Sequence, residues 1–341
     1  MPYKISVCIP VYNCAEYLFL ALNSILPQAD DQIEVIVYDG GSTDTTSELM
    51  NEYIKAWPKI QYHRGSQRGG IDADLAKCID FAKGEFCWLF SGDDIMRPGA
   101  IQKALEWIHQ GYDIYICKHT FCNKKMEIFY EYPVMKPDKI FFIDLALDNE
   151  RHEWFSRAIT TEAFFSFMSS IIVRKKTWLK GELPFAFEKS CWGHVARFFE
   201  LIPMGLRVCY IAEVMLDKRG ENDSFADHGI VNRIRIGVDG FHGLADHYFG
   251  HESMEAYHIR RTIRNELSLS TLLSIKLRCT DQPQLGNIEL LDKLVSRIYC
   301  DHRWDVILKR FIYFSIPYWA LIVLKFCYQP LKLIRPELKY G

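Results

Sequence analysis

The first hundred residues alternate short apolar runs with segments of helical periodicity, and this alternation restricts the possible folds more than any other feature of the sequence. Apolar, β-rich runs that predict strands lie at residues 5–9, 34–38, 60–62 and 86–90. Segments with apolar side chains at helical spacing lie between them, at residues 15–25, 42–56 and 71–82. Apolar strands that alternate with helices are typical of a mostly parallel sheet with helices on both faces, so we expect an α/β fold.

Beyond residue 100 the alternation becomes less regular. Further strands are predicted at residues 113–118, 166–173 and 207–211, and further helices at residues 99–109 and 192–202. From about residue 227 onward only helical spacing remains. We therefore expect an α/β domain over residues 1–225 and a helical C-terminal region over residues 226–341.

Composition excludes several classes of protein. With 49% apolar and 25% charged residues, the chain is not intrinsically disordered. Its net charge of −2 does not suggest a nucleic-acid-coating surface. The 11 cysteines are scattered without a CxxC pair, which argues against a zinc knuckle or a disulfide framework. No apolar leader and no run of 18 uncharged apolar residues is present, so we expect a cytoplasmic protein without a membrane span.

Polar residues directly follow three of the expected strands. They are Pro10-Val11-Tyr12-Asn13, Asp39-Gly40-Gly41-Ser42-Thr43-Asp44 and Ser91-Gly92-Asp93-Asp94. The carboxyl ends of parallel neighbours open on one edge of a sheet, where ligands bind. Carboxylates there suit Mg²⁺ or Mn²⁺, with further oxygens from a bound diphosphate. Each loop alone is also ordinary turn or helix-cap chemistry, but the three together favour a nucleotide-diphosphate site.

Linked segments of the chain resemble family 2 glycosyltransferases of the GT-A fold. They are residues 5–13, residues 38–44, Ala82-Lys83-Gly84-Glu85, and Ser91-Gly92-Asp93-Asp94 followed by Pro98. The resemblance covers about residues 3–120 and weakens through residue 220. It implies transfer of a sugar from a nucleotide-diphosphate sugar to an acceptor hydroxyl, with a donor half over residues 1–120 and an acceptor half over residues 121–225.

The same resemblance implies roles for individual residues. Pro10, Tyr12 and Asp39 would hold the base and ribose, and Arg64 or Arg68 the nucleotide or its phosphates. Mg²⁺ or Mn²⁺ would be bound by Asp93, with Asp94 as a second ligand. The remaining members of the expected donor site are Asn13, Asp72, Ser91 and Gly92.

The chain departs from the family pattern at three places. Gly40 and Ser91 each stand where the family often has an Asp. Inverting members also present an acidic pair at the start of a late helix, and the matching stretch here is Ser190-Cys191-Trp192-Gly193-His194. His194 is the candidate general base, since an imidazole can accept a proton at neutral pH.

Other interpretations of this site stay open. His194 could instead pack against Trp192, or a retaining reaction could need no protein base. Other acidic candidates for the base are Asp72, Asp74 and Glu188.

Within the family, the chain most resembles abequosyltransferase-like enzymes of O-antigen biosynthesis. Gly70-Ile71-Asp72, residues 82–89 and Gly92-Asp93-Asp94 carry this likeness. It implies a dideoxyhexose from a CDP-sugar as donor, and an oligosaccharide on undecaprenyl diphosphate as acceptor.

Two later segments are candidates for substrate contacts. Residues 150–155 read as a loop in which Glu153 and Trp154 could meet an acceptor sugar, and Trp192 is a further candidate. Asp217-Lys218-Arg219-Gly220-Glu221-Asn222 follows a strand-like run and could reach the donor diphosphate, although an ordinary solvated loop fits equally well.

Residues 303–341 carry a separate signal. An apolar, aromatic stretch at residues 311–324 is flanked by Lys309, Arg310, Lys325 and further basic residues. This pattern predicts a helix that lies in the headgroup layer on the inner face of the cytoplasmic membrane, or one that packs on the α/β domain.

Two alternatives to a transferase also remain: an inactive scaffold that binds membrane or partner enzymes, and a nucleotidyltransferase.

Overall fold

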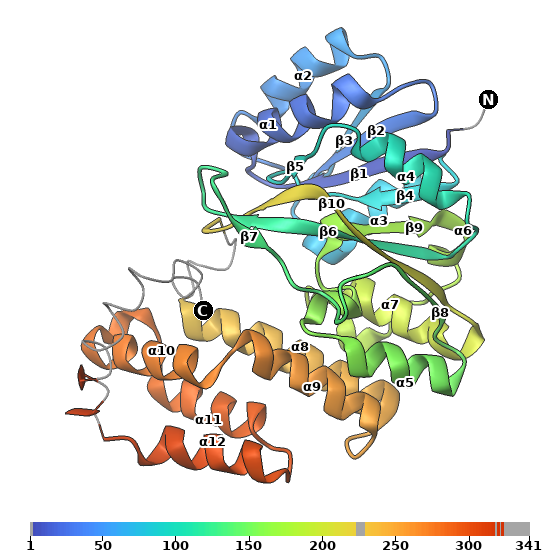
Figure 1. The fold of residues 1–341 in the computed structure, drawn as a ribbon. Helices are drawn as coiled ribbons and strands as arrows, with labels where there is room; N and C mark the ends of the chain where they lie inside the picture. Colours follow the sequence, from blue (N-terminus) through green and yellow to red (C-terminus); the bar gives the residue numbers. More distant parts are fainter. Residues whose placement is uncertain (1–2, 223–228, 318, 321, 324–341) are drawn as a thin grey trace. The chain divides into compact units, whose positions relative to one another are not determined.

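The computed structural model describes residues 3–222, 229–317, 319–320 and 322–323. The chain forms two compact units (Figure 1). The first comprises Met1–Arg157 and Glu162–Glu221, and the second comprises Ala158–Thr161 and Asn222–Gly341. The first is an α/β unit and the second is helical.

The first unit is built on one large sheet. Its strands are β1 (Ile5–Val11), β2 (Ile33–Asp39), β3 (Ile60–Arg64), β4 (Phe86–Leu89), β5 (Ile95–Met96), β6 (Ile114–Cys122), β7 (Ile128–Glu131), β8 (Phe141–Asp144), β9 (Ile171–Arg174) and β10 (Arg207–Arg219). Their order is β3-β2-β1-β4-β9-β6-β10-β5, with β7 beside β6 and β8 beside β10.

The predicted mostly parallel sheet is confirmed. β1 pairs in parallel with β2 and with β4, which puts Val11 opposite Asp39 and Cys8 opposite Leu89. β2 also pairs in parallel with β3, and β10 with β6. The exception inside the sheet is β9, which lies antiparallel between β4 and β6. The carboxyl ends of β1, β2 and β4 therefore open on one edge.

Helices and short 3-10 turns connect the strands. The helices of this unit are α1 (Ala15–Ile25), α2 (Thr46–Ala56), α3 (Ile71–Phe81), α4 (Ala100–Ile108), α5 (Asp148–Arg157), α6 (Lys175–Trp178) and α7 (Gly193–Leu201). Right-handed crossovers put α1 and α2 on one face of the sheet and α3 on the other, as Figure 1 shows. The apolar stripe of α1 at Leu18, Leu22 and Ile25 is fully buried.

A buried carboxylate fastens the start of β4 to β1 and β2. Glu34 is fully buried and accepts hydrogen bonds from Ser6 Oγ at 2.6 Å, Lys83 N at 2.6 Å and Gln61 Nε2 at 2.7 Å. These donors offset the cost of burying its charge. At Gly84 a Cβ atom would lie 2.6 Å from Ser6 Oγ, which explains why glycine stands there.

Two segments differ from expectation. Residues 150–155, predicted as a loop, belong to α5, because Arg151 pairs with Asp148 and Arg157 with Glu153 at helical spacing. β10 is longer than expected and runs through Arg219, so residues 217–219 are strand and not loop. The alternative of an ordinary solvated loop is therefore wrong for residues 217–219, while residues 220–222 lie outside any helix or strand.

The second unit confirms the predicted helical C-terminal region. Its helices are α8 (Ile230–Phe249), α9 (Met254–Glu266), α10 (Leu269–Asp281), α11 (Ile288–Ile298) and α12 (Trp304–Ser315). Side-chain N-caps from Ser253, Ser268 and Asn287 begin α9, α10 and α11. Among the described residues, no helix is both long and apolar enough to cross a membrane.

Candidate functional site

Hydrogen bonds join the loop after β1 to the loop after β2. The Asn13 amide donates to Ser42 Oγ at 2.9 Å, and Asn13 Oδ1 accepts from the Thr43 amide at 2.8 Å. Asn13 has a φ of +51°, a conformation that asparagine tolerates better than most residues. Its role is therefore to hold the two loops together at the sheet edge.

Asp39, at the end of β2, lies buried under its own loop. Its Oδ1 accepts from the Ser42 amide at 2.7 Å, and its Oδ2 accepts from the Tyr62 hydroxyl at 2.7 Å. Arg64 Nε lies 3.6 Å from the same Oδ2. Burial, followed by this hydrogen bond to Asp39, raises the pKa of Tyr62 to about 12, so Tyr62 stays a donor at neutral pH.

Exposed groups stand above this buried carboxylate. The guanidinium of Arg68 lies 4.4 Å from the centroid of the Tyr12 ring, and Tyr12 is 36% exposed. Arg64 Nη2 donates to the Ser42 carbonyl at 2.6 Å. Pro10 is buried within β1, so it offers little surface to a ligand.

The loop after β4 carries the acidic pair, and the two carboxylates differ in environment. Asp93 is half-buried, and its Oδ1 accepts from the Ser91 hydroxyl. Its backbone carbonyl accepts from Arg219 Nε at 2.9 Å. Gly92 is packed so closely that a Cβ atom would lie 2.9 Å from Val11 Cγ1, which presses this loop against the end of β1.

The expectation that Asp94 helps to bind a metal is not supported. Asp94 is 2% exposed; its Oδ2 accepts from Ser169 Oγ at 2.5 Å and its Oδ1 from the Arg219 amide at 2.9 Å. Burial, together with the charge of Asp93, raises the pKa of Asp94 to about 8. Asp94 points into the core, where it joins the β4 loop to β10.

The loop after β4 packs against the loop after β1, since a Cβ atom at Gly92 would lie 3.2 Å from Cys14 Sγ. Burial raises the pKa of the Cys14 thiol to about 12, and the negative charges of Asp93, Asp44 and Asp94 contribute to this rise. These carboxylates come from the loops after β2 and β4, while Cys14 follows β1. Within the described residues, no group of three or more His, Cys, Asp or Glu side chains could hold a metal ion alone. The donor set fits a divalent ion only with Asp93 as carboxylate and a bound diphosphate supplying other oxygens.

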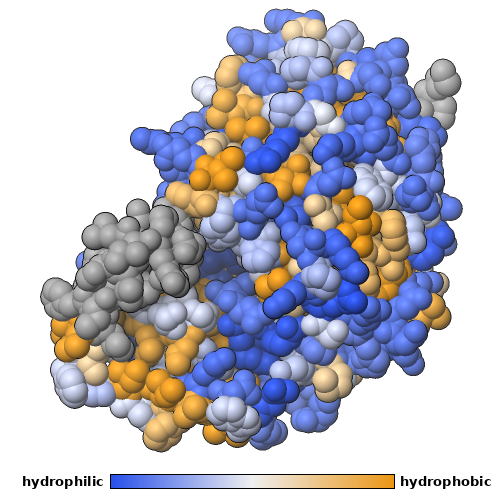
Figure 2. Space-filling view, in the orientation of Figure 1, coloured by the Kyte–Doolittle hydropathy of each residue, from blue (hydrophilic) through white to orange (hydrophobic). Residues whose placement is uncertain are grey.

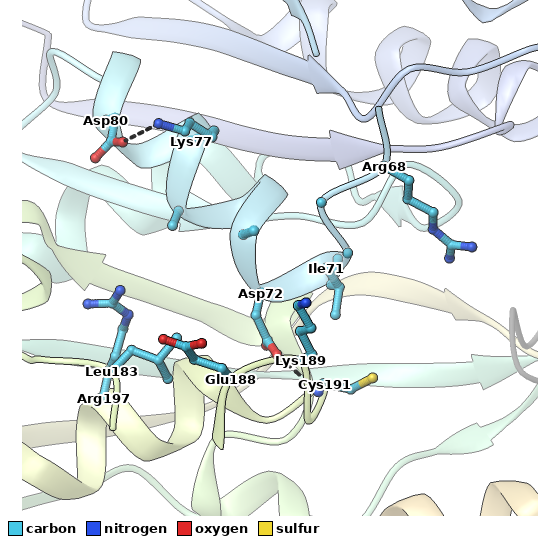
Figure 3. Close-up of a pocket in the computed structure, with 14 residues that line it drawn as sticks. Arg68, Ile71, Asp72, Lys77, Asp80, Leu183, Glu188, Lys189, Cys191 and Arg197 are labelled. Atoms are coloured by element: carbon cyan, nitrogen blue, oxygen red, sulfur yellow. Dashed lines mark hydrogen bonds and ion pairs between the residues drawn. The ribbon is translucent and has the colours of Figure 1, made fainter. Parts of the chain in front are cut away.

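A cavity of about 640 Å³ runs along α3 and is bounded on its other side by the segment that leads into α7 and by Arg197 of α7 (Figure 3). It begins at Arg68 and is lined by charged side chains of both signs. Its charged lining residues are Arg68, Asp72, Lys77, Asp80, Glu188, Lys189 and Arg197. Arg68 also lies over the Tyr12 ring, so this one residue belongs both to the cavity and to the loops at the sheet edge.

Asp72 connects the cavity to the start of α7. Its carboxylate accepts from the Cys191 amide at 3.0 Å and the Gly193 amide at 2.9 Å. Burial raises the pKa of Asp72 in spite of these two hydrogen bonds. A Cβ atom at residue 193 would lie 2.9 Å from Asp72 Cγ, so the Asp72 carboxylate has room only because residue 193 is a glycine.

His194 does not reach the cavity. It is 6% exposed, and its Nε2 lies 2.9 Å from the Phe165 carbonyl, so Nε2–H donates there. Burial lowers the pKa of His194 to about 4. The geometry supports packing of His194 in the core and gives no support to a role as general base.

The expected acceptor residues are placed differently as well. Trp154 is fully buried and donates from Nε1 to the Ala163 carbonyl at 2.9 Å, so it cannot stack on a sugar. This part of the sequence-based prediction is wrong. Glu153 is exposed and pairs with Arg157 along α5. Trp192 is 8% exposed, which leaves little ring surface for a ligand.

Sequence reasoning missed two polar partners of the acidic loops. Tyr62 binds the buried Asp39, and Ser169 binds Asp94. Tyr62 could have been found, because it lies near the end of a predicted strand beside β2. Ser169 could not, because its contact spans 75 residues and depends on the antiparallel insertion of β9.

Comparisons with known proteins agree with this geometry. The model of the family described as Glycosyl transferase family 2 matches residues 6–170. The abequosyltransferase RfbV of Salmonella typhimurium is 30% identical over 253 residues, which cover 72% of this chain and 75% of that protein.

Two solved structures share the fold. The S. aureus TarS 1–349 complex with UDP-GlcNAc superposes with a TM-score of 0.57 at 18% identity, over 86% of this chain and 81% of that chain. The mannosyltransferase PcManGT from Pyrobaculum calidifontis, in complex with GDP-Man and Mn²⁺, gives 0.51 at 15% identity, over 95% and 88%. With the sheet edge and its acidic loops, these matches show that the chain belongs to glycosyl transferase family 2 and is a glycosyltransferase of the GT-A fold.

Proposed function

We propose that this glycosyltransferase moves a sugar from a nucleotide-diphosphate sugar to a hydroxyl of a lipid-linked oligosaccharide in O-antigen biosynthesis. The observation that carries the proposal is the position of Arg68, which lies over the Tyr12 ring and also lines the cavity together with Asp72. The name of the Salmonella relative supports a dideoxyhexose such as abequose as the sugar transferred. The UDP-GlcNAc and GDP-Man complexes of the structural relatives support a nucleotide sugar as donor.

Donor binding is assigned to residues 1–120 and acceptor binding to residues 121–225. Tyr12, with Arg68 over its ring, would stack on the nucleotide base, while Arg64 supplies positive charge beside it. Asp39, Asn13 and Ser42 keep the two loops in position through the hydrogen bonds described above.

Asp93 would hold a divalent cation against the donor diphosphate. The Mn²⁺ in the mannosyltransferase complex supports this assignment. A cation there would stabilise the negative charge that develops on the departing diphosphate. Ser91 orients the Asp93 carboxylate through its hydroxyl, and Arg219 holds the backbone of the same residue.

Three carboxylates line this cavity, those of Asp72, Asp80 and Glu188, and we assign Asp72 as the proton acceptor for the acceptor hydroxyl. It lines the cavity, whereas His194 does not, and burial raises the pKa of its carboxyl. A carboxylate with a raised pKa is a stronger base, as general-base catalysis at neutral pH requires. The backbone amides of Cys191 and Gly193 fix its orientation.

We also place the protein on the inner surface of the cytoplasmic membrane through α12. One side of this helix exposes apolar side chains: Trp304 (75%), Ile307 (52%), Leu308 (46%), Phe311 (66%) and Phe314 (45%). The other side buries Val306 and Tyr313 within the second unit. Figure 2 shows apolar surface in this part of the second unit. Positive charge that suits anionic lipids comes from Arg303, Lys309 and Arg310. The remainder of the predicted segment, residues 318, 321 and 324–341, lies outside the described residues.

Thermal stabilisation by nucleotide sugars tests the donor assignment. CDP-, UDP-, GDP- and dTDP-sugars would be compared with and without Mn²⁺, because a ligand at 100 times its Kd stabilises by about 2.7 kcal/mol. We expect one nucleotide series to raise the melting temperature, more strongly with Mn²⁺. Tyr12→Ala should remove the effect, and Phe19→Ala, which truncates an exposed aromatic ring on α1, should keep it. Stabilisation by none of the four series would contradict the proposal.

A further inference from the structure

We propose that the β6–β7 hairpin carries a binding site for a pyranose ring of the acceptor saccharide, formed by the rings of Phe121, Tyr130 and Tyr132 (the aromatic shelf) with Lys218 at its edge. The proposal rests on the proposed function, because it names the place where the acceptor is held. It assigns the acceptor contacts to residues that differ from those suggested by the sequence.

The hairpin register puts the three rings on one face. Phe121 on β6 pairs directly with Tyr130 on β7, and Tyr132 follows Tyr130 at the two-residue period of a strand. Ring centroids lie 5.7 Å apart for Phe121 and Tyr130, and 6.2 Å apart for Tyr130 and Tyr132, with planes inclined by 29° and 21°. All three side chains are half-buried. The three rings therefore form one aromatic cluster along the hairpin, and each of them is partly exposed.

Polar groups lie against the Tyr132 ring, the last of the three. Lys218 Nζ lies 5.3 Å from the centroid of the Tyr132 ring and 3.2 Å from Glu162 Oε1. Glu162 is buried, and its Oε2 lies 2.6 Å from His119 Nε2, while the His119 ring stacks on Tyr132 at 5.0 Å. The His119 ring therefore packs against Tyr132, and the buried Glu162 carboxylate fixes the position of Lys218.

This combination suits a sugar better than a peptide or a lipid. A pyranose has an apolar face of C–H groups and a rim of hydroxyls, so it matches flat rings edged by a charged donor. Sites for small polar ligands typically combine aromatic walls with a few fixed polar groups. A lipid chain would not need the Lys218–Glu162 ion pair, whose desolvation it would make unfavourable.

The shelf adjoins the donor loops through β10. Lys218 is followed by Arg219, whose amide donates to Asp94 Oδ1 and whose Nε donates to the Asp93 carbonyl. Lys218, at the edge of the shelf, is thus the direct neighbour along β10 of the residue that holds the loop assigned to the metal and the donor diphosphate.

Saturation-transfer NMR tests the shelf directly. The probes are methyl glycosides of glucose, galactose, mannose and rhamnose, with sorbitol as an open-chain control of similar size. We expect transfer to the ring C–H protons of at least one glycoside and none to sorbitol. Tyr132→Ala and Tyr130→Ala should reduce this transfer about three- to tenfold, because each removes one stacking partner.

A matched variant separates stacking from general damage. Phe142 is 43% exposed and stacks on Tyr112 at 5.1 Å, elsewhere in the same unit, so Phe142→Ala should keep the signal. Donor-induced thermal stabilisation should be unchanged in all three variants. If donors stabilise the protein but no glycoside receives transfer, or Tyr132→Ala and Tyr130→Ala keep it, the shelf is wrong while the transferase proposal stands. If no donor stabilises the protein, the donor assignment fails independently of the shelf.

Discussion

The carboxylate of Asp74 occupies the space that a side chain at residue 40 would need. A Cβ atom at Gly40 would lie 2.6 Å from Asp74 Oδ2, closer than real Cβ contacts come. Asp74 belongs to α3 and accepts hydrogen bonds from the Gly69 and Gly70 amides. Its burial raises the pKa of its carboxyl. The loop after β2 has Gly40 where the family often has an Asp. A carboxylate is nevertheless present beside this position, because Asp74 of α3 provides it.

This contact predicts a coupled pair of substitutions. Gly40→Ala should lower the free energy of unfolding by about 1–3 kcal/mol, since it overpacks the Asp74 carboxylate. Adding Asp74→Ala should recover part of that loss. Gly237→Ala is the matched control, because Gly237 lies in α8 and an added methyl group would meet no atom within 4 Å beyond its own helix. Urea unfolding of Gly40→Ala, Asp74→Ala, the double variant and the control measures the coupling; strictly additive effects of the first two would contradict it.

The two acidic residues after β4 should behave differently when each is changed. Asp93→Asn should abolish the Mn²⁺-dependent part of donor binding and leave the melting temperature almost unchanged, because Asp93 is half-buried. Asp94→Ala should lower the melting temperature, because it leaves Ser169 Oγ and the Arg219 amide without their acceptor. EDTA should reproduce the Asp93→Asn effect in the wild type. Equal loss of stability in both variants would contradict the division of roles.

The parts of the fold that could be predicted are those that depend on residues close together in the sequence. β1 to β4 and the helices between them follow from local patterns, since each apolar run ends at polar or glycine residues within its own segment. That the loops after these strands lie at one edge of the sheet could be predicted from the parallel arrangement alone. β9 forms because it can pair with both β4 and β6, and Ser169 then meets Asp94. Contacts of that kind leave no periodic signal in the sequence.

The environment of single side chains was the least predictable part. Trp154 and Glu153 are neighbours in sequence, yet one is buried and the other exposed, because α5 turns them to different sides. His194 stands at a helix start where a catalytic group was expected, but its ring points to the Phe165 carbonyl. Side-chain direction at a helix N-terminus depends on what packs there, and Asp72 from α3 occupies that place.

The cavity assignment predicts an effect of Asp72→Asn on turnover. An amide cannot accept a proton at neutral pH, so kcat should fall by about 100-fold or more, with donor affinity retained. Asp80→Asn is the control, because Asp80 lies on the same helix, is exposed and lines the same cavity. It should keep kcat within about threefold, as expected for a group without a role in proton transfer. A kcat for Asp72→Asn equal to that of Asp80→Asn would exclude Asp72 as the base.

Burial of His194 predicts that acid destabilises the first unit. Its pKa is lowered to about 4 by burial, against about 6.5 in an unfolded chain, so the unfolded chain binds more protons between these values. The stability contributed by neutral His194 is complete above pH 6.5 and is lost as the pH falls toward 4. The slope approaches about 1.4 kcal/mol per pH unit for this single group.

Comparison of variants isolates the contribution of His194. His194→Asn should lose less stability than the wild type between pH 7 and pH 5 in urea unfolding. His109→Asn changes an exposed histidine of the same unit and should follow the wild-type curve. Equal pH slopes for wild type and His194→Asn would show that the buried imidazole is not responsible.

The exposed side of α12 predicts binding to anionic membranes. Trp304 and Phe311 are separated by seven residues and therefore lie on the same side of the helix, where they can enter the headgroup layer together. Vesicles of phosphatidylglycerol and phosphatidylethanolamine should carry the wild-type protein upward in a flotation gradient, and high salt should weaken this binding. Trp304→Glu with Phe311→Glu should leave the protein at the bottom of the gradient. Met254→Glu changes another exposed apolar residue of the second unit and should float as the wild type does. Flotation of the double variant to the same extent as the wild type would show that α12 is not the membrane-binding surface.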